Sequence, residues 1–262
     1  EKKYPMVPYV WYMENGNISA GIRQTNENAR YSIGFFSLFS TIGFLPEMNR
    51  LKPYKERVNA VYALFESFMD VINKDGEHIL RMIEKARESF KTQKIFNLNY
   101  KLNQEKFKMV NYLGYESVQK ISEFSGLPTL YYNYSKPFAT MLKWYYQYEP
   151  EISIKKPQAY IIPQRWLNIV DNLKRNGVTL KMLEHDSMLQ VTVYHIKELK
   201  TSEKPFEKHN LHSNVRVEKS KEQINFKKGD YLLPMNQESN KFIIEVLEPE
   251  GENSFFAWNY FD

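Results

Sequence analysis

The period of the apolar residues changes near residue 95, and this change constrains the fold more than any other feature of the sequence. Between residues 58 and 90, large apolar side chains recur every three or four positions, which is typical of amphipathic helices. From Ile95 to Leu102 apolar and polar residues alternate, as in a strand with one buried face. The pattern therefore predicts an α/β region followed by a β-rich region.

Three elements are expected before residue 95. The apolar run Ile42–Leu45 predicts a short buried strand that Pro46 ends. The apolar positions from Val58 to Ile72 predict a helix that begins near Pro53. A second helix is expected up to residue 90, with Asp75 as its N-cap.

A strand–helix–strand unit is predicted near residues 158–184. Ala159–Ile162 has the composition of a strand, and an amphipathic helix follows that should end at Gly177. The next strand is expected at Val178–Leu183. Further β patterns occur at Leu189–Ile196 and Phe242–Leu247.

Charge and composition exclude some classes of protein. The chain has 36 basic and 31 acidic residues, a near balance that argues against a dedicated nucleic-acid surface. No apolar run reaches the ~18 residues typical of a transmembrane helix. The chain has 0 cysteines, which excludes disulfides, thiolate metal sites and a cysteine nucleophile. Because residue 1 is Glu rather than Met, we expect the chain to begin inside a longer gene product or after processing.

Four parts of the sequence form a recognisable series. The first two are Tyr31-Ser32-Ile33-Gly34-Phe35 and the stretch from Glu47 to Val58, which includes Leu51-Lys52-Pro53-Tyr54-Lys55. The third is Ala159-Tyr160-Ile161-Ile162-Pro163. The fourth is Glu245-Val246-Leu247-Glu248-Pro249, followed by Ser254-Phe255-Phe256-Ala257-Trp258-Asn259-Tyr260-Phe261-Asp262.

In this order and spacing the four parts resemble the later part of bacterial zinc carboxypeptidases of the carboxypeptidase A type. The resemblance is to the long subgroup with an extra C-terminal domain, and it spans nearly the whole chain. It implies that residues 1–94 are the tail of a carboxypeptidase-like α/β domain. Residues 95–262 are then a β-rich α+β accessory region. The resemblance also implies a secreted, periplasmic or cell-surface protein.

Glu47 is the catalytic residue that the resemblance implies. In relatives the strand ends in a Glu-Thr-His type of sequence, whose glutamate is the general base that activates a zinc-bound water. Here Met48 and Asn49 replace the threonine and histidine. A carboxylate at the C-terminal end of a buried strand points into the crevice where open α/β sheets bind ligands. The alternative is a surface carboxylate that the dipole of the next helix stabilises.

The zinc ligands of this family lie before the catalytic glutamate, as a His-x-x-Glu pair and a later histidine. No histidine precedes Glu47 in this chain. Zinc is therefore expected in the intact protein, with its ligands upstream, and no metal is expected in this chain. Either the metal-binding half was removed, or the chain is a separate non-catalytic product. Arg23, Arg30 and Arg50 are the nearby candidates for binding a substrate carboxylate.

The later histidines are weak candidates for a metal site. His195 and Glu198 have the His-x-x-Glu spacing, but in a strand residues three apart point to opposite faces. His209 and His212 follow a segment that resembles a Pro-Phe-Glu-Gly-His stretch of relatives, with Lys208 in place of the glycine. We interpret both as loop histidines that bond to backbone groups.

The aromatic residues between Tyr131 and Tyr148 have two interpretations. They are either a platform for stacking sugars or peptides, or the packed core of a β-rich domain. We favour the core, with Trp144 mostly buried and Lys143 exposed. Leu142, Trp144, Tyr146 and Tyr148 should then face inward, with Tyr145 opposite.

Two functions follow from these observations. The first is the C-terminal portion of a zinc-dependent metallocarboxypeptidase-like peptide hydrolase, whose upstream half carries the zinc site. The second is a non-catalytic binding or assembly module for peptide or glycan, derived from such a protein.

Overall fold

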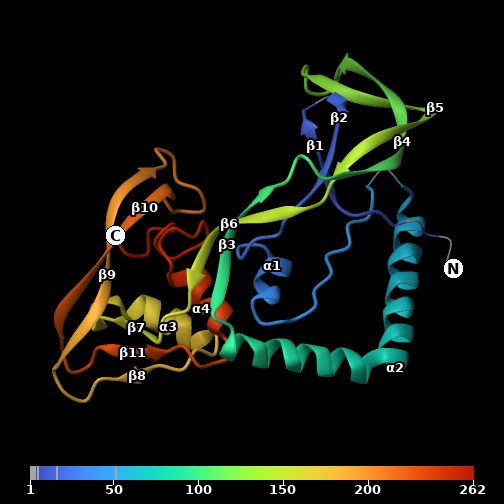
Figure 1. Cartoon of the computed structure of the whole chain (residues 1–262). Coiled ribbons are helices and arrows are strands. Elements are labelled where there is room, and N and C mark those ends of the chain that lie inside the picture. Colours follow the sequence, from blue (N-terminus) through green and yellow to red (C-terminus); the bar gives the residue numbers. More distant parts are fainter. Residues whose placement is uncertain (1–3, 5, 16, 51) are drawn as a thin grey trace. The chain divides into compact units, whose positions relative to one another are not determined.

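Four α-helices and eleven β-strands form in the part of the chain that the computed structural model describes, residues 4, 6–15, 17–50 and 52–262 (Figure 1). The mixed, strand-rich α/β class expected from the sequence is confirmed. Contacts divide the chain into two compact units. Unit 1 comprises Glu1–Tyr4, Glu27–Asn99 and Pro150–Asp262, and unit 2 comprises Pro5–Asn26 and Tyr100–Glu149. The division predicted near residue 94 separates the tail of a carboxypeptidase-like domain from an accessory region, and this division stays a prediction.

The core of unit 1 forms around a three-stranded sheet. Its order is β7 (Ala159–Ile162), β11 (Tyr231–Pro234) and β8 (Lys181–Met182), with β11 antiparallel to both neighbours. A short 3-10 turn and α3 (Leu167–Arg175) connect β7 to β8. Gly177 follows the helix at φ +74°, a conformation that favours glycine. The strand–helix–strand unit is confirmed, although β8 is shorter than predicted.

The run Phe242–Leu247 predicts a strand, and this prediction is wrong because the structure forms α4 (Asn240–Leu247) there. Phe242, Ile243, Ile244 and Val246 are buried, and Lys241 and Glu245, four positions apart, form only a narrow polar stripe. A short apolar run of this kind does not distinguish a strand from a buried helix. The buried core of unit 1 includes side chains from β3 (Ile95–Leu102), α3, β11 and α4: Phe96, Leu98, Ile169, Val170, Leu173, Leu233, Phe242, Ile243 and Ile244.

Two further strand pairs involve unit 1. β9 (Ser187–Thr201) pairs antiparallel with β10 (His212–Phe226), which confirms the strand predicted from residue 189. β3 (Ile95–Leu102) pairs with β6 (Tyr148–Lys155). Both β3 and β6 begin in one unit and end in the other.

Unit 2 contains a four-stranded sheet. Its order is β1 (Val10–Glu14), β2 (Asn17–Gln24), β5 (Pro128–Tyr145) and β4 (Phe107–Ile121). Lys143 is exposed as predicted, and Trp144 is partly buried. Tyr145, predicted to face outward, is buried: its ring packs on Phe107 at 5.7 Å between centroids. Gly21 makes room for it, because a Cβ there would lie 3.1 Å from the Tyr145 ring.

The tyrosines at the start of β5 do not form the predicted core. Tyr131, Tyr132 and Tyr134 are 43%, 45% and 56% exposed. In the described residues β2 pairs with β5 near Trp144 and Tyr145, so the hairpin around Tyr131 is two-stranded. Adjacent residues of a strand point to opposite faces, so Tyr131 does not share a face with Tyr132, whereas Tyr132 and Tyr134 are two positions apart.

The predicted strand Ile42–Leu45 is not formed. After α1 (Ser32–Ser37), residues 41–49 adopt neither helix nor strand. Ile42, Phe44 and Leu45 are 58%, 66% and 63% exposed. A lone strand leaves its backbone N–H and C=O groups unpaired, and no strand in the described ranges pairs with this segment.

α2 (Tyr54–Thr92) is one helix of 39 residues where two were predicted. Asp75 lies inside it rather than at an N-cap, and Figure 1 shows a sharp bend along the helix. Gly76 is the glycine of this helix, and a glycine costs only ~1 kcal/mol in a helix interior. None of the helices in the described part of the chain combines the length and apolar character needed to cross a bilayer.

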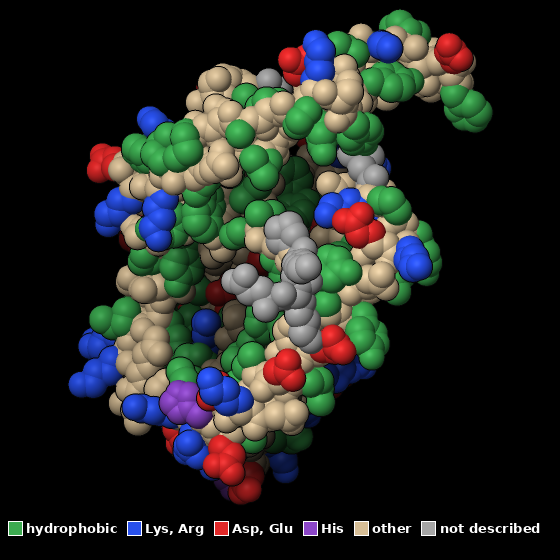
Figure 2. Space-filling view, turned by 90° about the vertical axis from the view of Figure 1, so that its right-hand side faces the viewer, with side chains coloured by type: hydrophobic (Ala, Val, Ile, Leu, Met, Phe, Trp, Pro, Cys, Tyr) green, Lys and Arg blue, Asp and Glu red, His purple; other side chains and the backbone are tan. Residues whose placement is uncertain are grey.

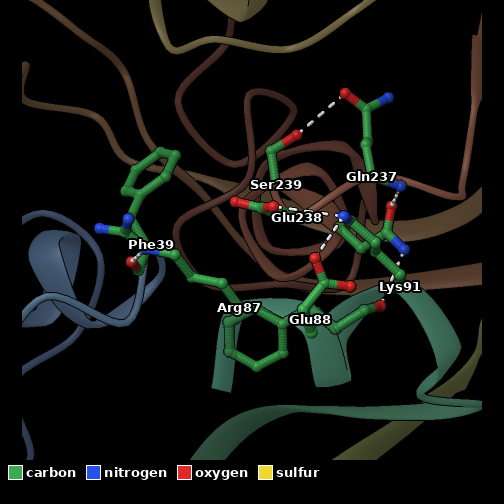
Figure 3. A network of polar contacts seen from close by, with 9 residues as sticks. Phe39, Arg87, Glu88, Lys91, Gln237, Glu238 and Ser239 are labelled. Carbon is green, nitrogen blue, oxygen red and sulfur yellow. Dashed lines mark hydrogen bonds and ion pairs between the residues drawn. The ribbon is translucent and has the colours of Figure 1, made fainter. Parts of the chain in front are cut away.

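Polar contacts tie the C-terminal end of α2 to the rest of unit 1 (Figure 3). Arg87 Nε donates to the carbonyl of Phe39 at 3.2 Å. Lys91 Nζ lies 2.8 Å from the Glu88 carboxylate and 3.2 Å from that of Glu238. Hydrogen bonds to these two carboxylates raise the pKa of Lys91. This end of the helix is therefore fixed by both charge and packing.

Candidate functional site

The segment that carries Glu47 is anchored at two points. Where it begins, Phe39 packs on Phe242 of the core, with 5.2 Å between ring centroids. Farther along, Phe44 packs on Phe68 of α2 at 4.8 Å. Glu47 is exposed, and no residue that the structure describes forms an ion pair or hydrogen bond with its carboxylate. The carboxylate is thus presented to solvent in a segment that packs on α2.

The surface next to Glu47 is apolar. Met48 and the first turns of α2 line an open groove of about 350 Å³, whose other lining residues are Tyr54, Arg57, Val58, Val61, Tyr62 and Phe65. A second groove of about 350 Å³ continues along the helix and is lined by Tyr62, Phe65, Glu66, Met69 and Asp70. We call the residues that line these two grooves the α2 face. Figure 2 views the molecule from the side where α2 lies in Figure 1, and apolar side chains are open to solvent there.

The α2 face includes a polar group without a partner. The Arg57 guanidinium carbon lies 5.6 Å from the Tyr54 ring centroid. Its Nε is buried and has no hydrogen-bond acceptor among the described residues. A buried donor without an acceptor costs roughly 1–3 kcal/mol. The α2 face therefore combines exposed rings with a buried donor that no described residue satisfies.

These residues supply a carboxylate and an apolar surface, but they do not fit a zinc site. Within the described ranges, no group of three or more His, Cys, Asp or Glu side chains is placed to hold a metal ion. No histidine precedes Glu47 in the sequence. A solvated carboxylate acts as a general base only when a substrate and a water are held within hydrogen-bond reach.

The three arginines considered for substrate binding lie in different settings. Arg23 belongs to β2 of unit 2. Arg50 is exposed in the turn before α2, and Leu51, which follows it in the resembling motif, lies outside the described residues. Arg30 precedes α1 and lies over aromatic rings, with its guanidinium carbon 4.5 Å from the Phe206 centroid.

His195 and Glu198 lie in β9, so the predicted strand location is confirmed. His195 Nε2 contacts Ser220 Oγ at 2.9 Å and the Glu222 carboxylate at 2.7 Å. Glu198 instead faces Arg216 at 3.6 Å. The two side chains therefore have different partners, and the His-x-x-Glu spacing has no shared function in the described residues.

The ring nitrogens of His209 and His212 bond to side chains, so the expectation of backbone partners is wrong. His209 Nδ1 lies 2.7 Å from Asn259 Oδ1. His212, which is buried, contacts Thr201 Oγ1 at 2.9 Å and Asp262 Oδ1 at 3.2 Å. Asn259 and Asp262 come from the C-terminal motif 50 positions along the chain, a distance over which local sequence carries no signal.

A buried carboxylate that the sequence did not reveal follows α4. Glu248 is 2% exposed and accepts hydrogen bonds from the hydroxyls of Tyr160 in β7 and Tyr194 in β9. Burial raises the pKa of Glu248, and the two hydrogen bonds only partly offset this. Burial also raises the pKa of both tyrosines. Since the partners come from β7, β9 and the end of α4, the carboxylate holds three elements of unit 1 together.

Known proteins match this chain in part. No family model matches it, and no solved structure matches it. Carboxypeptidase 2 of Trichophyton rubrum is 28% identical over 110 residues, which cover 42% of this chain and 20% of that protein. Carboxypeptidase 2 of Trichophyton tonsurans is 28% identical over 103 residues, which cover 39% of this chain and 19% of that protein. The match thus spans about a fifth of each fungal relative and is evidence of a carboxypeptidase-like relationship over that stretch.

Proposed function

We propose that this chain is the C-terminal portion of a zinc-dependent carboxypeptidase-like peptide hydrolase. In this proposal Glu47 is the general base, and the zinc ligands belong to an upstream part of the protein. The similarity to two fungal carboxypeptidases supports a peptidase-related function. The bacterial origin, the long subgroup and a secreted, periplasmic or cell-surface location remain parts of the proposal.

The observation that carries the proposal is the open α2 face beside Glu47. Exposed apolar patches of this kind mark surfaces that another polypeptide covers. The segment Ile42–Leu45 has a strand-forming sequence and lacks a neighbouring strand in the described residues. In this proposal an upstream half supplies a neighbouring strand for Ile42–Leu45 and covers the α2 face. Glu47 then lies at the edge of a sheet, where a substrate can bind.

Glu47 has one chemical task in this arrangement. It accepts a proton from the attacking water and delivers it to the leaving amine of the peptide. The carboxylate needs no other partner within this chain, which agrees with its lack of a described ion pair.

Substitution of Glu47 tests the proposal in the full-length protein. Glu47→Gln keeps the size of the side chain and removes its basicity, so peptide hydrolysis should fall by ~10²-fold or more. Folding and zinc content should stay near wild-type values, because the side chain is exposed. Glu84→Gln, an exposed carboxylate elsewhere on α2, is the matched control and should leave turnover unchanged. Near-wild-type turnover in Glu47→Gln would show that Glu47 is not the general base.

A non-catalytic binding module for peptide or glycan is the second candidate. The exposed rings of Tyr131, Tyr132 and Tyr134 favour it, because exposed tyrosines stack on such ligands. An intact protein that lacks hydrolytic activity yet loses ligand binding on Tyr132→Ala and Tyr134→Ala would support this function over the enzyme.

A further inference from the structure

The turn that joins β4 to β5 in unit 2 presents apolar side chains to solvent. Phe124 is fully exposed, and Ile121 and Leu127 on either side of it are each 64% exposed. Single exposed apolar residues are common on protein surfaces, whereas a group of them at one end of an element marks a surface that meets an apolar partner. We call Ile121, Phe124 and Leu127 the hairpin tip.

The backbone of the turn is hydrogen-bonded within the turn itself. Ser122 N–H donates to the Leu127 carbonyl at 2.9 Å, and Gly126 N–H donates to the Ser122 carbonyl at 2.8 Å. The Ser122 hydroxyl oxygen accepts from the N–H groups of Phe124 and Ser125, each at 3.3 Å. Gly126 has φ +69°, a conformation that favours glycine. These donors do not need water, which is the condition for placing backbone in a lipid layer.

Tyrosine rings lie behind the hairpin tip on both strands of the ribbon. Tyr131 pairs with Val118, three positions from Ile121, and Tyr132 pairs with Ser117. At a rise of ~3.3 Å per residue, these rings are roughly 10 Å behind the turn. Tyrosine is enriched at the level of lipid headgroups, because its ring is apolar and its hydroxyl is polar. Along the hairpin, apolar side chains therefore come first and amphipathic rings next, as in the layers of a bilayer surface.

The charges of the hairpin favour an uncharged partner surface. Between residues 113 and 136 there are two acidic and two basic side chains, whose charges cancel: Glu116, Lys120, Glu123 and Lys136. Lys136 forms an ion pair with Glu116 at 3.0 Å. Lys120 lies over the ring of Tyr131, 5.8 Å from its centroid. A hairpin without net charge is not directed to a charged protein surface or to an anionic lipid.

We propose that the hairpin tip inserts into the surface of a lipid bilayer with zwitterionic headgroups. Its three side chains enter the boundary between headgroups and acyl chains, and the tyrosines stay among the headgroups. Insertion is shallow, because Glu123 adjoins Phe124 and a carboxylate is costly to remove from water. This agrees with the depth of roughly 5–10 Å that interfacial elements reach.

A protein partner suits this turn less well than a lipid surface does. Proteins that bind an extended segment draw on its main-chain hydrogen bonds, and the donors of this turn are occupied internally. The inference does not depend on the proposed peptidase activity, because Glu47 and zinc take no part in it.

Sedimentation of the purified chain with vesicles of pure phosphatidylcholine tests the proposal. The chain should pellet with the vesicles, and added sodium chloride should not release it, because the hairpin carries no net charge. Binding that requires phosphatidylserine in the vesicles and is lost in salt would arise from surface charge, and it would overturn the proposal.

Substitutions locate the binding surface. Phe124→Ser should weaken binding to vesicles by about tenfold or more, because it removes a large apolar side chain that leaves water on insertion. Since the side chain is fully exposed, the variant should fold as the wild type does. Leu113→Ser is the matched control on β4, because Leu113 is 73% exposed and lies away from the turn. Phe65→Ala is the control for the α2 face, and both controls should bind as the wild type does.

A fluorescent reporter measures insertion directly. Vesicles of brominated phosphatidylcholine should quench the added emission of Phe124→Trp and leave that of Leu113→Trp unquenched. Glu123→Gln should bind more tightly, because an amide costs less to remove from water than a carboxylate. Wild-type binding in Phe124→Ser, an equal loss in either control, or equal quenching at the two reporter positions would each overturn the proposal.

Sedimentation equilibrium without lipid tests a protein partner for the same residues. Phe124→Ser should leave the oligomeric state of the chain unchanged. A wild-type dimer that this variant dissociates, together with no binding to vesicles, would assign the hairpin tip to a second copy of the chain and overturn the lipid proposal.

Discussion

The two halves of α2 belong to one helix but have different surroundings. In the C-terminal half, Phe90 packs against the core and Arg87 and Lys91 bond to neighbouring segments. In the N-terminal half, Tyr62, Phe65 and Met69 are 68%, 61% and 57% exposed. The apolar spacing is similar in the two halves, yet the structure covers mainly the last turns: Ile83, Ala86 and Phe90 are partly buried, whereas Leu80 and Met82 just before them are 61% and 59% exposed.

This difference shows what helical periodicity means. A three- and four-residue spacing indicates that a helix has an apolar face, but it does not identify what covers that face. In the C-terminal half the partner is α4 and the segment around Phe39, which this chain supplies. For the N-terminal half, the function proposed above assigns the partner to an upstream polypeptide.

Truncation of Phe242 should give the largest effect. Phe242 is buried in the region that covers the C-terminal half of α2, and its ring contacts Phe35 at 6.2 Å and Phe39 at 5.2 Å. Phe242→Ala should lower the free energy of unfolding of this chain by ~3–5 kcal/mol, because it leaves a cavity. Urea unfolding followed by circular dichroism measures this change. A loss below about 1 kcal/mol would mean that this region is no better packed than the exposed half.

Titration of Glu248 should give an intermediate effect within the same covered core. Burial raises its pKa in the folded state above the ordinary value of 4.5. The folded chain therefore holds this proton more tightly than the unfolded chain. The stability contribution of Glu248 is greatest below pH ~4.5 and falls as the pH rises through the folded pKa, by at most ~1.4 kcal/mol per pH unit.

Comparison with Glu248→Gln isolates this contribution from other titrating groups. The free energy of unfolding of the wild type minus that of Glu248→Gln should decrease as the pH rises from 4 to 8. The variant cannot ionise at this position, so the difference follows Glu248 alone. A difference that is constant over this range, or that increases with pH, would contradict the assigned effect of burial.

Truncation of Phe65 should give the smallest effect in this chain. Its ring is exposed on the α2 face, so Phe65→Ala should change the free energy of unfolding by no more than ~0.5 kcal/mol. Binding of a hydrophobic dye should decrease, because the variant removes exposed apolar surface. In the full-length protein the same substitution should cost ~3–5 kcal/mol once the face is covered. An equal, small effect in both forms would show that nothing covers the α2 face.

The sequence predicted those elements whose pattern depends on neighbours in the chain. The strand–helix–strand unit followed from Ala159–Ile162, the amphipathic helix and Gly177, and β3 followed from its alternation. α4 was missed because its eight residues are mostly buried and apolar, and the pair Lys241 and Glu245 is too short a stripe to reveal the helical period. The strand at Ile42–Leu45 was wrong because a strand also needs a partner, which a pattern does not supply.

From the sequence, only the identity of the candidate catalytic residue was predictable, not its surroundings. Glu47 came from a motif, and its exposure depends on what covers the α2 face, which the chain does not encode locally. The surroundings of Arg30, a residue that the sequence did single out, were unpredictable for another reason. The rings near it belong to Tyr31, Phe206 and Trp258, and only the tertiary fold brings the last two to Arg30.

The interleaving of the two units in the sequence has a consequence for synthesis on the ribosome. Unit 2 is complete once residue 149 has emerged, whereas unit 1 still needs Pro150–Asp262. During this interval α4 has not yet been made, so the C-terminal half of α2 lacks this partner. Apolar surface that is exposed during synthesis is a site for aggregation and for chaperone binding. The order of translation therefore leaves the apolar face of α2 exposed until Pro150–Asp262 has been made.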